Sequence, residues 1–200
     1  MTRQDLAAEM CAAYSLLSTE HRLVLLEEGV SVRDLDQFQM CGVAPMRIDG
    51  ELYQPADGRL AIITPVRVYD FFSPESPNPC ADCRLGSIVD LVAWDIRYPD
   101  RWALRTGNAE WLGCIEPQYL KPKSVPIRRS VVSWFQAGCT GLVLLSRSRL
   151  DQYRILMNCC GGIIAEDAAH HAELRRILSA PVQHSADLDA GQKPYEAWCA

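Results

Sequence analysis

The chain has 200 residues, of which 48% are hydrophobic and 22% are charged, and its formal net charge is −5. A chain of this length buries about 70% of the surface that it exposes when unfolded, so it can form a core without disulfide or metal staples. The apolar content excludes a disordered or collagen-like chain, and no apolar run approaches the roughly 20 residues of a membrane span. We therefore expect a globular α+β protein of the cytoplasm, without a secretory leader and without a membrane partner.

The first predicted element is helical and covers residues 4–28. Its apolar residues recur at helical spacing, and these are Leu6, Met10, Ala13 and Leu17. Ser18 is a candidate N-cap that divides the segment into two helices, and Gly29 suits the position after its end. Ser31, three residues before Asp34, imitates a capping box and predicts a brief third helix.

A small antiparallel meander is predicted for residues 46–70. The dipeptides Asp49-Gly50 and Asp57-Gly58 are typical of hairpin turns. Residues 60–69 are rich in Ile, Val and Thr, which favour strands.

A boundary between two units is predicted at residues 73–79. This segment has three prolines in seven positions, which exclude a helix interior and a central strand. It separates residues 1–72, with the helices and the meander, from residues 80–180. The polar residues 181–200 are expected to form a mobile tail.

The second unit is predicted to be a mixed α/β domain. Apolar runs, prolines, glycines and candidate caps give its elements. In chain order these are a strand or short buried helix at 88–94, a helix at 99–106, a helix at 127–137, a strand at 141–145, a helix or strand at 149–157 and a helix at 165–178. The fold class is thus α+β, with a mixed α/β C-terminal half.

Two of the nine cysteines, Cys80 and Cys83, have a spacing that metal sites use. The residues from Cys80 to Val92 resemble the C-terminal half of the zinc ribbon of bacterial and phage DNA primases, where a CxxC knuckle, a glycine and a short apolar segment with an internal Asp follow one another. The resemblance covers about 15 residues of the chain. It implies zinc as a cofactor, and an origin in a phage or mobile element with a link to DNA replication.

The ligand set of such a ribbon is incomplete in this chain. The family has a Cys and a His roughly 17 to 20 residues before the CxxC, where this chain has Leu60 to Thr64. Cys41, His21 or a distant cysteine would have to complete a zinc site. The alternative is an ordinary loop with two reduced thiols.

A second cluster of metal-ligating residue types is Glu166, Asp167, His170 and His171. On a helix each acid lies one turn from one histidine, so each pair could share one side of a metal ion. Acids in a first turn also complement the helix dipole, and we prefer this structural role. The residues expected to face the core are Ile164, Ala168, Leu174 and Ile177, which leaves the histidines partly exposed.

Basic residues gather in one part of the chain. Residues 121–154 carry a net charge of +6, whereas residues 1–43 carry −4. The candidate phosphate-binding residues are Arg128, Arg129, Arg147, Arg149 and Arg154, and the candidate stacking residues are Trp102, Trp111 and Trp134. Arg101 and Arg105 would lie one helical turn apart. Against nucleic-acid binding stands a pI of 5.4, since nucleic-acid domains are usually basic.

No nucleophile elbow, Walker A loop or dinucleotide-binding glycine motif occurs in the sequence. We therefore expect a non-catalytic accessory or interaction protein of phage or mobile-element type, linked to DNA replication, whose protein partner is unknown. One alternative is a small metal-binding protein or enzyme that uses Cys80, Cys83 and the helix of His170 and His171. The other is a nucleic-acid binder that uses residues 121–154.

Overall fold

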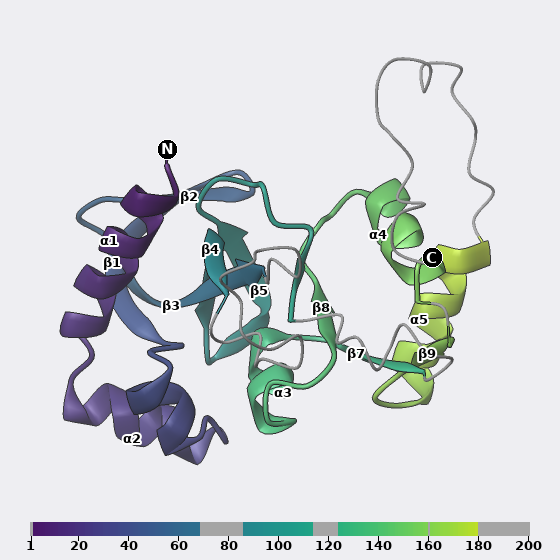
Figure 1. Ribbon diagram of the computed structural model, residues 1–200, viewed down its shortest axis with the longest axis horizontal. Coiled ribbons are helices and arrows are strands. Elements are labelled where there is room, and N and C mark those ends of the chain that lie inside the picture. Colours follow the sequence, from purple (N-terminus) through teal and green to yellow (C-terminus); the bar gives the residue numbers. More distant parts are fainter. Residues whose placement is uncertain (1, 69–85, 114–123, 160, 180–200) are drawn as a thin grey trace, which may run out of the picture.

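The structure is a computed structural model that describes residues 2–68, 86–113, 124–159 and 161–179, without the side chains of residues 99 and 100. N-terminal helices come first, a closed five-stranded barrel follows, and a mixed sheet with helices forms the C-terminal half (Figure 1). The predicted α+β class is confirmed. In the described part of the chain no helix has the length and apolar character needed to cross a membrane.

The N-terminal helices break where their caps predict. The elements are α1 (Arg3–Ser15), α2 (Thr19–Glu27) and a short π-helix, η1 (Arg33–Gln37). Ser18 forms a capping box with His21 at the start of α2, and Gly29 takes a φ of +91° after its end. The hydroxyl of Ser31 donates to the carboxylate of Asp34 at 2.6 Å, which holds the turn before η1. Local sequence therefore sets these three elements.

Five strands close into the barrel. They are β1 (Gly42–Asp49), β2 (Leu52–Pro55), β3 (Arg59–Val68), β4 (Ser87–Asp95) and β5 (Tyr98–Leu104). Their order around the barrel is β1-β2-β5-β4-β3. Neighbouring strands are antiparallel except β2 and β5, which run parallel and share one register pair, Leu52 with Leu104.

The predicted meander is right in its first hairpin and wrong in its second, because Asp57-Gly58 joins two strands that do not pair. β1 and β2 form a hairpin through Gly50, with a φ of +63°, as the Asp-Gly dipeptide predicts. β3, however, pairs with the other edge of β1 and with β4, so β2 and β3 are not neighbours. β1 is long enough to pair with β2 at its end and with β3 along its beginning.

The predicted helix at 99–106 is also wrong, because β5 occupies that segment. Pro99 suggested the first turn of a helix, but it lies near the start of β5, away from the single β2–β5 register pair at Leu104. A proline without an N–H is tolerated where a strand begins or has a free edge. Arg101 and Arg105 accordingly lie on and just after a strand.

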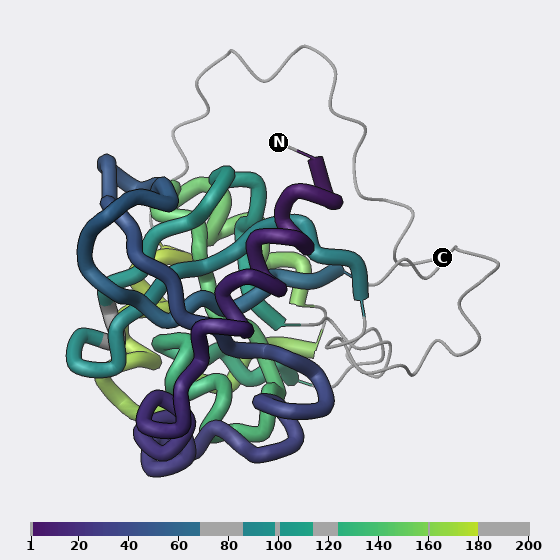
Figure 2. The backbone as a smooth tube through the Cα atoms, turned by 90° about the vertical axis from the view of Figure 1, so that its left-hand side faces the viewer, coloured from purple at the N-terminus to yellow at the C-terminus, as the bar shows by residue number. Residues whose placement is uncertain are grey.

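Helix α1 packs against the barrel and shares a core cluster with all five strands. Figure 2 shows α1 running obliquely across them. The strand members of this cluster are Met46, Tyr53, Ala61, Ile63, Ile88, Leu91, Ala93 and Ala103. Leu6, Met10 and Ala13 supply the helix side, as the helical spacing predicts. Several alanines among the strand residues leave room for the helix.

The C-terminal half contains a four-stranded sheet of order β6-β8-β7-β9, with β7 parallel to both neighbours. Its elements are β6 (Trp111–Leu112), β7 (Val125–Arg128), α3 (Val131–Gln136), β8 (Leu142–Leu144), α4 (Arg149–Met157), β9 (Ile163–Ile164) and α5 (Ala168–Ser179). The predicted strand at 141–145 and the predicted helix at 165–178 are confirmed. The helix predicted at 127–137 begins only after the N-cap Ser130, because β7 takes the preceding residues.

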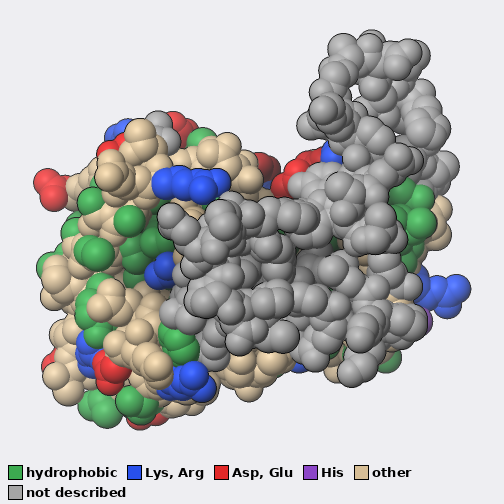
Figure 3. Space-filling view, in the orientation of Figure 1, with side chains coloured by type: hydrophobic (Ala, Val, Ile, Leu, Met, Phe, Trp, Pro, Cys, Tyr) green, Lys and Arg blue, Asp and Glu red, His purple; other side chains and the backbone are tan. Residues whose placement is uncertain are grey.

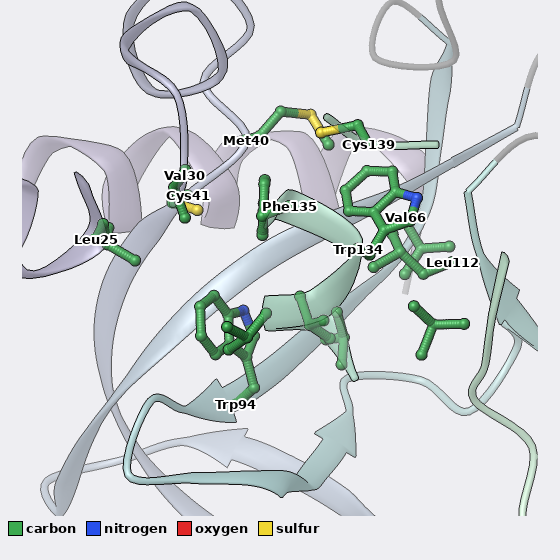
Figure 4. Packing of buried hydrophobic residues seen from close by; sticks show 14 of the residues in the cluster. Leu25, Val30, Met40, Cys41, Val66, Trp94, Leu112, Trp134, Phe135 and Cys139 are labelled. Carbon is green, nitrogen blue, oxygen red and sulfur yellow. The ribbon is translucent and has the colours of Figure 1, made fainter. Parts of the chain in front are cut away.

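One large core cluster joins α2, η1, the barrel, α3 and β8. Figure 4 shows Phe135 of α3 near Trp94 of β4 and Trp134, with ring centroids 6.1 Å and 5.1 Å away. The cluster includes Val66 and Trp134, from either side of the predicted boundary. The boundary itself, at 73–79, and the predicted tail, at 181–200, lie outside the described residues.

Candidate functional site

Glu166 and Asp167 lie directly before α5 and form hydrogen bonds at its start. Asp167 Oδ1 accepts the backbone N–H of His170 at 2.8 Å, and this hydrogen bond is the main reason that the pKa of Asp167 is lowered. The N–H of Glu166 donates to Nδ1 of His170 at 3.2 Å. Asp167 therefore caps the helix, whereas neither acid lies in its first turn, where the sequence placed them, because α5 begins at Ala168.

The buried face of α5 differs from the prediction at one turn. Leu174 and Ile177 are buried as expected, but His170 is only 4% exposed, whereas Ala168 and Ile164 are exposed. His170, Leu174 and Ile177 are four and three residues apart, which places them on one helical face. Ala168 is two residues before His170, which places it about 200° round the helix, on the side away from that face.

The two acids contact arginines of the neighbouring strand. Nη2 of Arg129 lies 2.8 Å from Oδ1 of Asp167, and Nη1 of Arg128 lies 3.9 Å from Oε1 of Glu166. The backbone N–H of Arg129 also donates to Glu166, at 3.3 Å. Within the described ranges, no three Asp, Glu, His or Cys side chains gather closely enough to hold a metal ion.

These residues border a cleft of about 490 Å³ between α5, the β7–β8 edge and α4. Three arginines and one glutamate line it, so its lining has a net charge of +2 when His170 is neutral. The full lining is Ile127, Arg128, Arg129, Leu144, Gln152, Ala169, His170, Glu173, Leu174, Arg176 and Ile177. We call this the α5 cleft.

The other predicted phosphate-binding residues lie elsewhere. Arg147 lines a second cleft of about 430 Å³, with its Cζ 5.1 Å from the ring centroid of Trp102 and its Nε 3.8 Å from Glu51. Arg154 pairs with Asp151 in α4. Arg149 begins α4 and is exposed. The structure thus divides the basic stretch between two clefts and pairs most of its described arginines with acids.

The three candidate stacking tryptophans have different environments. Trp134 is a core residue, 1% exposed, and its Nε1–H donates to the carbonyl of Gly141 at 3.2 Å. Trp102 is half-buried beneath Arg147, and Trp111 packs against the cluster under α4 and α5. Trp134 is therefore not a stacking surface.

The candidate zinc ligands Cys80 and Cys83 lie outside the described residues. Cys41, a candidate for completing their site, is fully buried with its Sγ 4.0 Å from Oγ1 of Thr64. Burial raises the pKa of this thiol well above its usual range, and zinc binds the thiolate. His21, the other candidate, uses its Nδ1 in the capping box with Ser18.

Asp90 is a buried carboxylate that the sequence analysis included only as the internal Asp of the apolar segment after Cys83. Its Oδ1 accepts the N–H groups of Leu91 and Thr106, at 2.8 and 2.9 Å. Its Oδ2 accepts those of Asn108 and Ala109, at 2.8 and 3.2 Å. Asp90 thus organises the loop after β5, which borders the second cleft.

Sequence reasoning missed three polar residues of the α5 cleft, namely Gln152, Glu173 and Arg176. Glu173 lies three residues after His170, on the same side of α5, so a helical projection centred on His170 would have found it. Arg176 lies six residues after His170, about 120° round the helix, and such a projection does not indicate it. Gln152 comes from α4 and has no such local indication.

Comparison of the chain with protein-family models, curated proteins and solved structures finds no match.

Proposed function

We propose that this chain is a non-catalytic interaction protein of the cytoplasm that binds a protein partner through an apolar face on its N-terminal helices. The observation that carries the proposal is a group of exposed aliphatic side chains on and around α2. We call it the α2 face, and its members are Leu16, Leu23, Val24, Leu26 and Val32.

The α2 face concentrates apolar surface that a monomer usually buries. Each of its five side chains is between 38% and 58% exposed. Twelve large hydrophobic residues are exposed in the described chain, and five of them fall within residues 16–32. Figure 3 shows hydrophobic side chains over α2 at the lower left. Single exposed aliphatic residues need no explanation, but a group of them is typical of a binding surface.

The charges beside this face indicate the chemistry of its partner. Glu20 and Glu27 are exposed on α2, and no contact with another described residue involves their carboxylates. Asp36, in contrast, pairs with Arg22. Since residues 1–43 carry a net charge of −4, the face fits a basic amphipathic helix that offers both leucines and lysines or arginines.

The phage or mobile-element origin and the link with DNA replication belong to the same proposal. Their support is the primase-ribbon resemblance of residues 80–92, of which the structure describes the part that enters β4. The partner would then be a basic protein of a replication complex.

Binding of a model helix tests the α2 face. A labelled leucine-lysine amphipathic peptide of about 18 residues, long enough to be helical, is titrated with the full chain in a fluorescence anisotropy assay. We expect binding that is about tenfold weaker for the double variant Leu23→Ser, Leu26→Ser. Met157→Ser is the matched control, because Met157 is similarly exposed and apolar but lies on α4.

Two results would contradict the proposal. One is equal binding of the peptide by the wild type and the double variant. The other is a concentration-dependent dimer, seen by analytical ultracentrifugation, that the double variant abolishes, since the α2 face would then be a contact between copies of this chain.

Nucleic-acid binding is the second candidate function, and the cation-aromatic contacts beside β5 favour it. Arg101 lies 4.8 Å and Arg59 5.8 Å from the ring centroid of Tyr98, which is 48% exposed, and Arg147 lies over Trp102. Such pairs resemble the basic and aromatic grooves that bind single strands. Charge reversal at Arg128 and Arg129 should abolish retention on single-stranded DNA if residues 121–154 bind it, and equal retention would exclude that stretch.

A further inference from the structure

The α5 cleft contains a buried histidine with one ring nitrogen that forms no hydrogen bond with the described residues. Nδ1 of His170 accepts the N–H of Glu166, so the proton of the neutral ring is on Nε2. Burial lowers the pKa of His170, which keeps the ring neutral near pH 7. Among the described residues, no hydrogen bond uses Nε2, although the residue is only 4% exposed and lines the cleft.

Three guanidinium groups surround the same space. Arg128 uses Nε for the carbonyl of Thr140, and Arg129 uses Nη2 for Asp167, so each retains further N–H groups. Arg176 is exposed on α5 and has no ion pair within the described part of the chain.

The rest of the cleft is apolar at its base. Ile127, Leu174 and Ile177 are each at least nine-tenths buried and belong to the cluster under the cleft. The volume of about 490 Å³ lies within the range of small-molecule sites and far exceeds the space of a single anion. A ligand here would therefore have an anionic group and an organic part.

We propose that the α5 cleft binds a small phosphate monoester, with the phosphate held by Arg128, Arg129, Arg176 and the Nε2–H of His170, and the organic group on Ile127, Leu174 and Ile177. A phosphate has three terminal oxygens, which suit four donors, two from the end of β7 and two from α5, better than the two oxygens of a carboxylate. Glu173, the one acid of the lining, is exposed and suits a hydroxyl or amine of the organic part.

Titration calorimetry of the full chain tests the site with three probes. Phenyl phosphate should bind about tenfold more tightly than inorganic phosphate, because only the ester covers the apolar base. Benzoate, which has the ring without the phosphate, should bind more weakly than phenyl phosphate. Equal affinity for benzoate and phenyl phosphate would overturn the assignment of the ligand class.

Two pairs of neighbouring residues provide matched variants. Arg176→Gln and His170→Gln should each weaken phenyl phosphate about tenfold or more. Arg175→Gln and His171→Gln should leave affinity unchanged, since both residues are exposed on α5 but outside the cleft lining. Arg176 is on the surface, so its variant keeps the test valid even if His170→Gln fails to fold.

Nuclear magnetic resonance gives an independent readout at the ring itself. On titration with phenyl phosphate, the imidazole signals of His170 should shift and those of His171 should stay in place, with the His170→Gln variant identifying the signals. Unmoved His170 signals, or equal affinity of the Arg176→Gln and Arg175→Gln variants, would overturn the proposal.

Discussion

Two buried polar residues, Asp90 of the barrel and His170 of the C-terminal half, differ in how many of their hydrogen-bonding atoms the described chain uses. In the barrel, Asp90 receives four backbone N–H donors, and the indole N–H of Trp94 donates to Thr64 at 2.8 Å. In the C-terminal half, His170 is almost as deeply buried but uses only one of its two ring nitrogens within the described chain.

This difference distinguishes a buried polar group that supports the structure from one that can bind a ligand. A buried polar group with all its partners fixes local geometry and has nothing left to offer a ligand. A buried donor that faces a cleft remains available, and it can donate a hydrogen bond to an acceptor atom of a ligand. We therefore expect Asp90 to support the structure, and the α5 cleft to bind a small molecule.

Removal of the Asp90 carboxylate is expected to have the largest effect. Asp90→Ala leaves four N–H groups without their acceptor and should lower the free energy of unfolding by about 3–5 kcal/mol. Urea denaturation followed by circular dichroism measures this loss. Asp57→Ala is the control, because Asp57 is exposed and its loss should change stability by less than about 0.5 kcal/mol. A similarly small loss of stability for Asp90→Ala would contradict the comparison. It would mean that the barrel does not depend on the four hydrogen bonds that Asp90 accepts.

Two glycines of the C-terminal half show whether its sheet is as tightly built as the barrel. A Cβ on Gly141, at a φ of +87°, would lie 2.3 Å from the carbonyl oxygen of Pro126. Gly138 has a φ of +66°, but a Cβ added there would meet nothing within 4 Å. We expect Gly141→Ala to lower the free energy of unfolding by about 3 kcal/mol and Gly138→Ala by about 1 kcal/mol, as urea denaturation would measure. Equal losses would mean that strand β8 can move away from β7, and that the cleft beside it is loosely held.

The smallest effect is expected in the pH dependence of stability. His170 has its pKa lowered from 6.5 by burial, despite the opposing influence of Glu166, Glu173 and Asp167, and Arg129 lowers it further. Its folded-state pKa is below its unfolded value, so the unfolded chain binds more protons between the two values. Stability should therefore be full above pH 6.5 and fall as the pH drops through that value.

Urea denaturation at a series of pH values between about 7 and 5 checks this expectation. The slope of unfolding free energy against pH should be shallower in His170→Gln and unchanged in His171→Gln. An unchanged slope in His170→Gln would show that its ring does not titrate in a buried environment.

Elements that depend on local sequence could be predicted, and those that depend on distant pairing could not. Ser18 and Gly29 define the ends of α2 by capping alone, and Gly50 defines the first hairpin. β5 has no local signal of this kind, because it forms a strand by pairing with β4 and β2. Pro99, taken alone, indicated the first turn of a helix. The parallel strand β7 was missed for the same reason, since its partners β8 and β9 come later in the chain.

The candidate site was predictable in its parts but not as an assembly. The sequence drew attention to Arg128 and Arg129 as basic residues and to His170 as a possible ligand, for unrelated reasons. Their common location follows from the ion pairs of these arginines with the acids at the start of α5. Nothing in the long stretch of chain between Arg129 and His170 indicates that contact, because it depends on how the sheet and the helix pack.

The closure of the barrel has a consequence for its motions. β3 and β4 are joined by seven register pairs, whereas β2 and β5 are joined by one. At that junction the N–H of Leu104 donates a hydrogen bond to the carbonyl of Glu51, at 3.0 Å. The β2–β5 junction thus has the fewest paired residues in the ring of strands, and local opening of the barrel should begin there. In hydrogen–deuterium exchange the amide of Leu104 should lose its protection well before that of Ala93 at the centre of the sheet.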